Sequence, residues 1–231
     1  KIGGGAFSQC TAFKEFSMPE GVTSLGAAFS GCTSLESITI PSGVTEIADG
    51  TFSGCTLLKK VTFSDGLKII GNGAFAGCDL EELILPPSVT TIKGSAFKNC
   101  KISELHLPSS LEFIGDYAFE GCVDLNSIYT YTIEPTVITE KTFSTFNTAT
   151  LNVPTTSFWN YYYDIGWSKF DHKKFQYFNE PYTFFYLNYD YYLNGSRGYV
   201  AGTPDVDMRP GSGLIVESHD TSESNQQNLG N

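Results

Sequence analysis

The stretch "TFSGCTLLKKVTF", residues 51–63, places a cysteine three residues after a phenylalanine and then a run of alternating apolar residues. Each of the 6 cysteines in the chain has a phenylalanine three residues before it. The cysteines recur every 22 or 23 residues, at Cys10, Cys32, Cys55, Cys78, Cys100 and Cys122. The phenylalanines keep the same interval, at Phe7, Phe29, Phe52, Phe75, Phe97 and Phe119. A fixed period of this length indicates a solenoid of stacked coils.

Each period also carries apolar residues at spacings that predict two short strands. After the cysteine, residues such as Leu58, Val61 and Phe63 alternate with polar residues over their last part, which is typical of a strand with one buried face. A second apolar pair follows, such as Val44 and Ile47, and predicts another extended segment on the far side of the coil. A corner of small residues then leads to the next phenylalanine.

One coil of this length cannot bury its own apolar stripe, so stacked coils must bury it between them. Equivalent side chains then form ladders, and the cysteines are interpreted as small buried side chains whose S–H groups face backbone carbonyls. Disulfides between neighbouring coils and a metal site are the alternatives. Stacked thiols point the same way and each has two equivalent neighbours, and no pair has the C-x₂₋₄-C spacing of a zinc site. The sequence therefore predicts six free thiols.

The coil sequences "IADGTFSGCTLLKKVTF" (47–63) and "IGDYAFEGCVDLNSIYT" (114–130) resemble the BspA-type leucine-rich repeats of bacterial surface proteins. The resemblance covers residues 1–154. It implies a right-handed leucine-rich-repeat solenoid of seven turns of 22–24 residues, with parallel strands on the concave side and short strands or 3₁₀ corners on the other. The seventh turn is degenerate, since Phe143 keeps the phenylalanine position but Phe146 stands where cysteine is expected.

After Pro154 the repeat stops, and three regions are predicted: the solenoid (1–154), a C-terminal cap (155–180) and a small β appendage with a polar tail (181–231). By the same resemblance, a short helix begins near Ser157, and Trp167 and Phe170 plug the open end. The cap is also favoured for Trp159 and Tyr163, with an aromatic platform for sugars as the alternative. In the appendage, Asn194-Gly195 predicts a hairpin turn and residues 214–217 a further strand.

Catalytic and cofactor motifs are lacking, so the chain is predicted not to be an enzyme and to need no cofactor or metal. The three histidines, at 106, 172 and 219, have no metal-binding spacing. "GNGAFAG" (71–77) is interpreted as a repeat corner, not a phosphate loop, and Asp205 and Asp207 as solvated carboxylates, not a calcium site. A net charge of -11 argues against nucleic acid and anionic membranes, and no apolar run reaches the ~18 residues that span a bilayer.

Binding is expected on the concave strand face of the solenoid, where the outward rows change character near the middle of the chain. Most coils carry serine or threonine there, but the central ones carry acidic, aromatic and apolar residues. The candidate binding residues are Lys60, Glu82, Ile84, Glu104, His106 and Tyr129. The alternative is that these are ordinary solvated strand residues.

The predicted function is a non-catalytic, secreted or surface-displayed bacterial interaction protein. Its partner would be a protein or a glycan on another cell or matrix, and adhesion is the role that the resemblance implies. The alternative is a carbohydrate-binding protein that uses the aromatic-rich C-terminal region. No export signal is visible, and because the chain opens mid-turn at Lys1, we expect either preceding repeats or end-to-end packing there.

Overall fold

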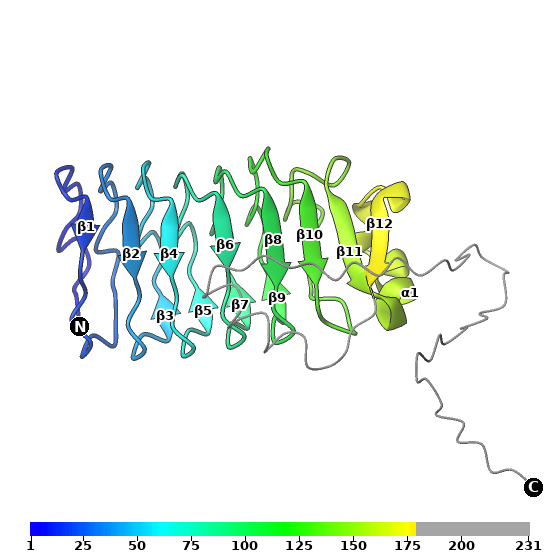
Figure 1. Ribbon diagram of the computed structural model, residues 1–231, viewed down its shortest axis with the longest axis horizontal. Coiled ribbons are helices and arrows are strands. Elements are labelled where there is room, and N and C mark those ends of the chain that lie inside the picture. Colours follow the sequence, from blue (N-terminus) through cyan, green and yellow to red (C-terminus); the bar gives the residue numbers. More distant parts are fainter. Residues whose placement is uncertain (179–231) are drawn as a thin grey trace, which may run out of the picture.

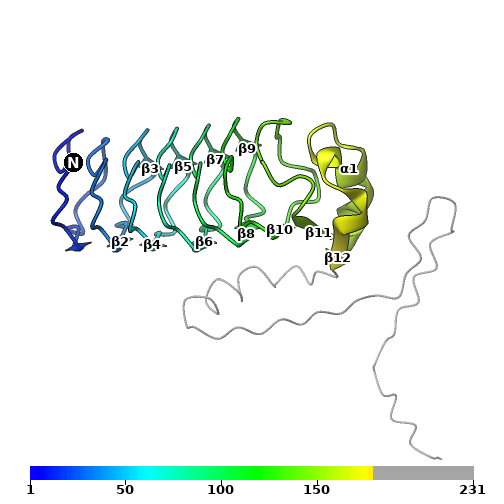
Figure 2. The ribbon, with the colours of Figure 1, turned by 90° about the horizontal axis from the view of Figure 1, so that it is seen from above.

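A computed structural model describes residues 1–178, which form a parallel β-solenoid of about seven turns. The predicted turn at Asn194-Gly195, the strand at 214–217, the appendage 181–231, His219, Asp205 and Asp207 lie outside the described residues. The coils follow one another along a nearly straight axis, with the N-terminus at one end and the cap at the other (Figures 1 and 2).

The alternating residues that follow each cysteine form the longer strands, which lie side by side on one face, called here the long-strand face (Figure 1). All neighbouring pairs are parallel. The strands are β1 (Glu15–Phe16), β2 (Ser37–Thr39), β4 (Lys60–Thr62), β6 (Glu82–Ile84), β8 (Glu104–Leu107), β10 (Ser127–Thr130), β11 (Thr150–Pro154) and β12 (Phe175–Phe178).

In four coils, the second apolar pair forms shorter strands on the opposite face (Figure 2). They are β3 (Glu46–Ile47), β5 (Ile69–Ile70), β7 (Thr91–Ile92) and β9 (Phe113–Ile114). Their register confirms the predicted repeat, since Ile47, Ile70, Ile92 and Ile114 pair in succession. These isoleucines are fully buried, so each coil covers the apolar side of the next.

The long strands form two hydrogen-bonded sheets, which the period does not predict. One contains β1, β2 and β4, and the other runs from β6 to β12. Across the break between β4 and β6, the Lys59 ammonium pairs with the carboxylates of Glu81 at 2.7 Å and Asp79 at 3.7 Å.

The ladder phenylalanines lie at the centre of the core. Consecutive rings from Phe7 to Phe143 have centroids 5.1–5.4 Å apart and interplanar angles of 3–22°. Those from Phe29 to Phe119 are completely buried. Each buried side chain of this size contributes about 1.5–3 kcal/mol relative to exposure, so the stacked rings are a principal source of stability.

The cysteines form a second ladder beside the rings. Each S–H from Cys32 to Cys122 donates to the carbonyl oxygen of the ladder phenylalanine one coil earlier, with Sγ–O distances of 3.0–3.2 Å. All six thiols are free. Cys10 was predicted to be buried, and this is wrong: it is half-buried, because no earlier coil of the described chain stacks on it.

Thiol chemistry tests this ladder. Burial raises the pKa of Cys122 to about 12 and also raises the pKa of Cys100. We expect Ellman reagent at pH 8 to modify Cys10 first and the five deeper thiols only after denaturation. Because unfolded thiols ionise near pH 8.5 and the buried thiols of Cys100 and Cys122 do not, their contribution to stability should be full below that pH and fall above it. The loss is about 1.4 kcal/mol per pH unit for each strongly shifted thiol. Rapid modification of several native thiols would contradict the ladder.

The small-residue corner before most of the ladder phenylalanines has an unusual backbone. Two residues before the ring, φ is 64° at Gly50 and 57° at Gly73, values in the left-handed region that glycine adopts most easily. This corner lets the chain turn sharply toward the interior, which explains the glycines of "GNGAF" as part of the repeat.

The cap closes the C-terminal end of the core. It contains η1 (Thr155–Ser157), α1 (Phe158–Tyr163), η2 (Trp167–Lys169) and η3 (His172–Lys174) before β12. Trp167 and Phe170 are buried, and their rings lie 5.9 and 5.6 Å from Phe143, so they cover the last ring of the ladder. The Trp167 indole N–H donates to the Thr136 carbonyl at 2.7 Å.

Two features of the cap differ from the prediction. For Tyr163 a role in the cap was favoured over an aromatic platform for sugars, but its side chain is 70% exposed, because the last turn of α1 points it away from the core. The cap also does more than fill the end, since β12 pairs in parallel with β11 and continues the long-strand face.

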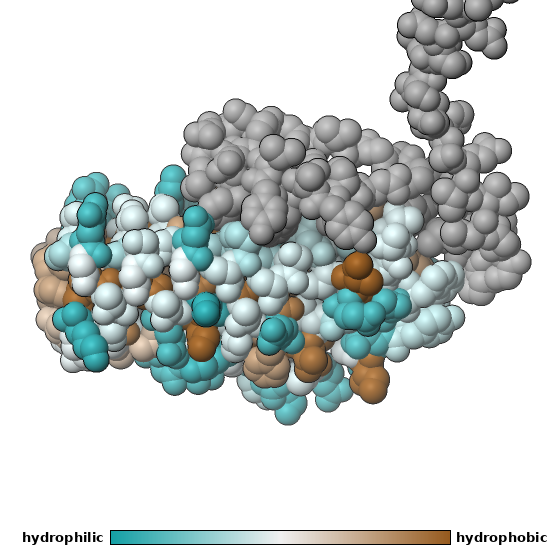
Figure 3. Space-filling model, turned by 90° about the horizontal axis from the view of Figure 1, so that it is seen from below, coloured by the Kyte–Doolittle hydropathy of each residue, from teal (hydrophilic) through white to brown (hydrophobic). Residues whose placement is uncertain are grey.

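On the face that Figure 3 shows, apolar side chains lie singly among polar ones, as is usual for a folded surface.

Candidate functional site

The register of the long strands brings several predicted binding residues into one row. Ile84 of β6, His106 of β8 and Tyr129 of β10 are direct partners in neighbouring strands. The His106 and Tyr129 rings stack face to face, with centroids 4.5 Å apart and planes at 3°. The row continues to Asn152 of β11, whose buried side chain donates to the Ile128 carbonyl at 3.2 Å.

His106 is held by hydrogen bonds at both ring nitrogens. Its Nε2 lies 2.6 Å from Glu104 Oε1, and its Nδ1 lies 2.7 Å from the Tyr131 hydroxyl. A carboxylate only accepts hydrogen bonds, so Nε2 carries the proton, and in the neutral ring Nδ1 accepts from the Tyr131 O–H. The His106 side chain is 16% exposed. The ring therefore has a fixed orientation as well as aromatic contacts.

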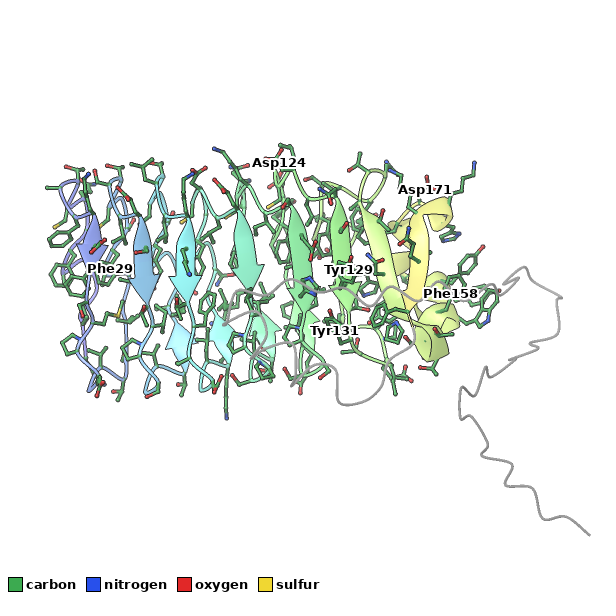
Figure 4. The ribbon with its side chains drawn as sticks, viewed as in Figure 1. Phe29, Asp124, Tyr129, Tyr131, Phe158 and Asp171 are labelled. Atoms are coloured by element: carbon green, nitrogen blue, oxygen red, sulfur yellow. The ribbon has the colours of Figure 1, made fainter. Side chains whose placement is uncertain are left out.

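Two further aromatic residues extend this group. The Tyr131 ring lies 5.9 Å from His106 and 5.6 Å from Phe178 of β12. Figure 4 shows Tyr129 and Tyr131 close together on the long-strand face toward the cap. We call Glu104, His106, Tyr129, Tyr131 and Phe178 the aromatic cluster. Its members can stack on a partner's flat groups and exchange hydrogen bonds with its polar ones.

Of the other candidate residues, Lys60 lies apart from the cluster and Glu82 lies beside it. Lys60 is exposed on β4, in the other long-strand sheet. Glu82 lies in register with Glu104. Of the six candidates, Glu104, His106 and Tyr129 are therefore in direct contact, and Ile84 is beside them in the row.

Sequence analysis missed Tyr131 and Phe178. The signal for Tyr131 was present, because the alternation that turns Ser127 and Tyr129 outward extends by one more step. No signal pointed to Phe178, which reaches the cluster only because the cap folds back and adds β12 to the sheet.

The cap carries a second group of aromatic side chains. Trp159 stacks on Tyr163 with centroids 5.8 Å apart and planes at 19°, and Tyr162 lies 4.0 Å from the His172 ring. Unlike Trp167 and Phe170, these four are not fully buried. The structure thus separates the aromatic residues of the cap into a buried plug and an outer group.

Metal and membrane features were searched over residues 1–178. Within that part of the chain, no three side chains of His, Cys, Asp or Glu gather as a metal ion would need. None of its helices combines the length and the apolar character needed to cross a membrane.

The repeat seen in the fold matches a known family. A model of the BspA type leucine-rich repeat region matches residues 1–103 and 68–196, with 6 copies. The chain belongs to the BspA-type leucine-rich repeat family. This BspA-type repeat protein has a fold and a family that are typically non-catalytic. No match is found among curated proteins.

Solved structures similar to this BspA-type protein are bacterial leucine-rich repeat proteins. One from Bacteroides ovatus is 32% identical with a TM-score of 0.60, covering 66% of this chain and 43% of the other. A T. pallidum leucine-rich repeat protein is 35% identical with a TM-score of 0.44, covering 46% of this chain and 50% of the other. A leucine-rich cell surface protein from Faecalibacterium prausnitzii is 17% identical with a TM-score of 0.43, covering 78% and 70%. The chain thus spans half or less of the first two.

Proposed function

We propose that the chain is a non-catalytic bacterial interaction protein, secreted or displayed at the cell surface, that binds a protein partner through the long-strand face. Family membership supports an interaction or surface role. The observation that carries the proposal is the aromatic cluster, in which the His106 ring stacks on Tyr129 and is fixed by Glu104 and Tyr131.

The composition of the rest of this face supports the same assignment. At the positions equivalent to His106 and Tyr129, the N-terminal coils carry Thr39 and Thr62. Aromatic side chains with a polar end are enriched at protein interfaces, because each supplies a large contact area together with a hydrogen bond. The change from threonine to histidine and tyrosine supports binding at the C-terminal half of the face. Adhesion to a host cell or matrix is the role that fits a partner outside the cell.

Replacing His106 and Tyr129 together by alanine tests this assignment. We expect the double variant to lose at least tenfold in affinity for any protein that the wild type binds in a panel of immobilised extracellular matrix proteins, since truncating a central interface residue costs about 2 kcal/mol or more. The Ser37→Ala/Thr39→Ala variant, altered on β2 of the same face, is the matched control. Circular dichroism checks that both variants fold. Equal affinity of the wild type and the His106→Ala/Tyr129→Ala double variant would contradict binding through the long-strand face.

Carbohydrate binding at the cap is the second candidate, and the stack of Trp159 on the exposed Tyr163 favours it. Sugar rings pack on flat aromatic faces of this kind. Adding glycans to the same panel distinguishes protein binding by the long-strand face from carbohydrate binding by the cap. Binding to glycans alone that is lost in Trp159→Ala and kept in the His106→Ala/Tyr129→Ala double variant would support the cap.

A further inference from the structure

The strongest local departure from the repeat is a tyrosine at a glycine-like corner. The position two residues before the ladder phenylalanine has a positive φ in five coils, with values of 55–73°. Three of these residues are glycine and one is serine, but the sixth coil has a tyrosine. They are Gly5, Gly50, Gly73, Ser95 and Tyr117. A bulky side chain in the left-handed region costs free energy that glycine does not.

The hydrogen bond that Tyr117 contributes to the corner comes from its backbone, not from its side chain. Its backbone N–H donates to the Lys141 carbonyl at 3.0 Å, a bond that the equivalent glycines also make to the next coil. The residue is 40% exposed, so its ring is not part of the core. A strained residue that contributes little to packing is a sign of function, because strain is tolerated where a specific side chain is required.

Two lysines flank the exposed ring. The Lys98 ammonium lies 5.8 Å and the Lys141 ammonium 5.9 Å from its centroid. Lys98 is also paired with Glu120 at 2.6 Å. For Lys141, which is exposed, no ion pair is found within residues 1–178. Three neighbouring coils thus place one aromatic ring and two cations together, on a chain whose net charge is -11. We call Lys98, Tyr117 and Lys141 the Tyr117 corner.

We propose that the Tyr117 corner binds acidic saccharides. The apolar face of a pyranose ring packs on the phenol ring, and the carboxylate or sulfate of the sugar pairs with the Lys141 ammonium. This combination of one flat aromatic surface and a few placed charges is what a small polar ligand requires. The site is separate from the aromatic cluster and does not depend on the function proposed for it.

An acidic peptide fits the corner less well. Peptides commonly bind to a repeat or a sheet through free backbone groups at an edge. Here the N–H groups of Tyr117 and Phe119 already donate to Lys141 and Thr142 of the next coil, and the Asp116 carbonyl accepts from Ser95. These backbone groups at the corner are therefore already hydrogen-bonded within the solenoid, so a ligand can contact the corner only through its side chains.

Affinity measurements with immobilised saccharides test the proposal on the full chain. The probes are sialyllactose, a hyaluronan hexasaccharide, a heparin hexasaccharide and neutral lactose, which separate carboxylated from sulfated ligands. We expect at least tenfold tighter binding to one acidic class than to lactose. Tyr117→Gly and Lys141→Gln should each weaken that binding tenfold or more. Phe113→Ala, which removes another exposed aromatic ring that belongs to neither candidate site, is the matched control and should have no effect.

Thermal unfolding supplies the second readout. Tyr117→Gly relieves a strained backbone, so its midpoint should equal or exceed that of the wild type, which separates loss of binding from loss of folding. A marked fall of the midpoint would assign Tyr117 a packing role and overturn the proposal. Equal binding of lactose and acidic sugars, or no saccharide binding at all, would also overturn it. Full binding by Tyr117→Gly, or an equal loss of binding in Phe113→Ala, would have the same consequence. If a polyglutamate peptide competes as effectively as the acidic sugar, the ligand of the Tyr117 corner would be an acidic peptide, and the saccharide proposal would be wrong.

Discussion

Replacing Phe75 by alanine is expected to lower the free energy of unfolding by about 3–5 kcal/mol. Phe75 stacks between Phe52 and Phe97 at 5.2 and 5.4 Å, and the Phe63 ring meets it edge-on at 5.8 Å. The side chain is completely buried, so its removal leaves a cavity between coils that cannot move closer without breaking their hydrogen bonds. In a solenoid each coil contacts only its neighbours, so the loss falls on the junctions with the coils of Phe52 and Phe97.

Denaturation monitored by two signals checks the Phe75 result. Far-UV circular dichroism follows all coils, whereas fluorescence follows the cap, because both tryptophans of the chain, Trp159 and Trp167, lie there. We expect a lower midpoint by both signals, and separate transitions if the weakened junctions let the two halves unfold independently. Phe113→Ala is the matched control. This phenylalanine is 42% exposed, so its loss should cost less than about 1 kcal/mol. Similar costs for both variants would contradict the ladder as the main source of stability.

Replacing Trp167 by alanine should destabilise the protein by a similar amount, about 3–5 kcal/mol. Trp167 is completely buried, packs at 5.9 Å from Phe143, and donates its indole N–H to Thr136 at 2.7 Å. Its loss removes the cover from the last ring of the ladder and leaves the Thr136 carbonyl without that partner. Exposed ends of solenoids also promote association, which is why a cap is required for solubility.

Two measurements follow the Trp167 variant. Urea denaturation gives the loss of stability, and size-exclusion chromatography shows whether the uncovered end makes the protein associate. Trp159→Ala is the matched control, since it removes the same residue type from the outer surface of α1, where the indole is only partly buried. We expect the control to remain monomeric if the wild type is, and to lose less stability. A Trp167 variant as stable as the Trp159 variant would show that the cap is not needed to close the core.

The aromatic cluster and the Tyr117 corner lie on different parts of the coil. The cluster is on the long-strand face, whereas the corner precedes the ladder phenylalanine and involves only Lys98, Tyr117 and Lys141. The two sets of variants report on them separately.

The period of the sequence determined the coils, the buried ladders and the register of both rows of strands. It did so because each coil is built from the same local pattern, and stacking equivalent positions needs no information from distant residues. It also identified Glu104, His106 and Tyr129 as outward residues at neighbouring positions, since alternation along a strand and register between strands are both readable from spacing.

Only the tertiary structure decided the features that depend on where the repeat is broken. The cap folds back so that Phe178 joins Tyr131 beside His106, and it buries Trp167 while leaving Tyr163 exposed. The positive φ of Tyr117 and its approach to two lysines likewise appear only when three coils are stacked. The physical reason is that a period specifies contacts between equivalent positions, whereas these contacts join non-equivalent positions and depend on the path of the chain in three dimensions.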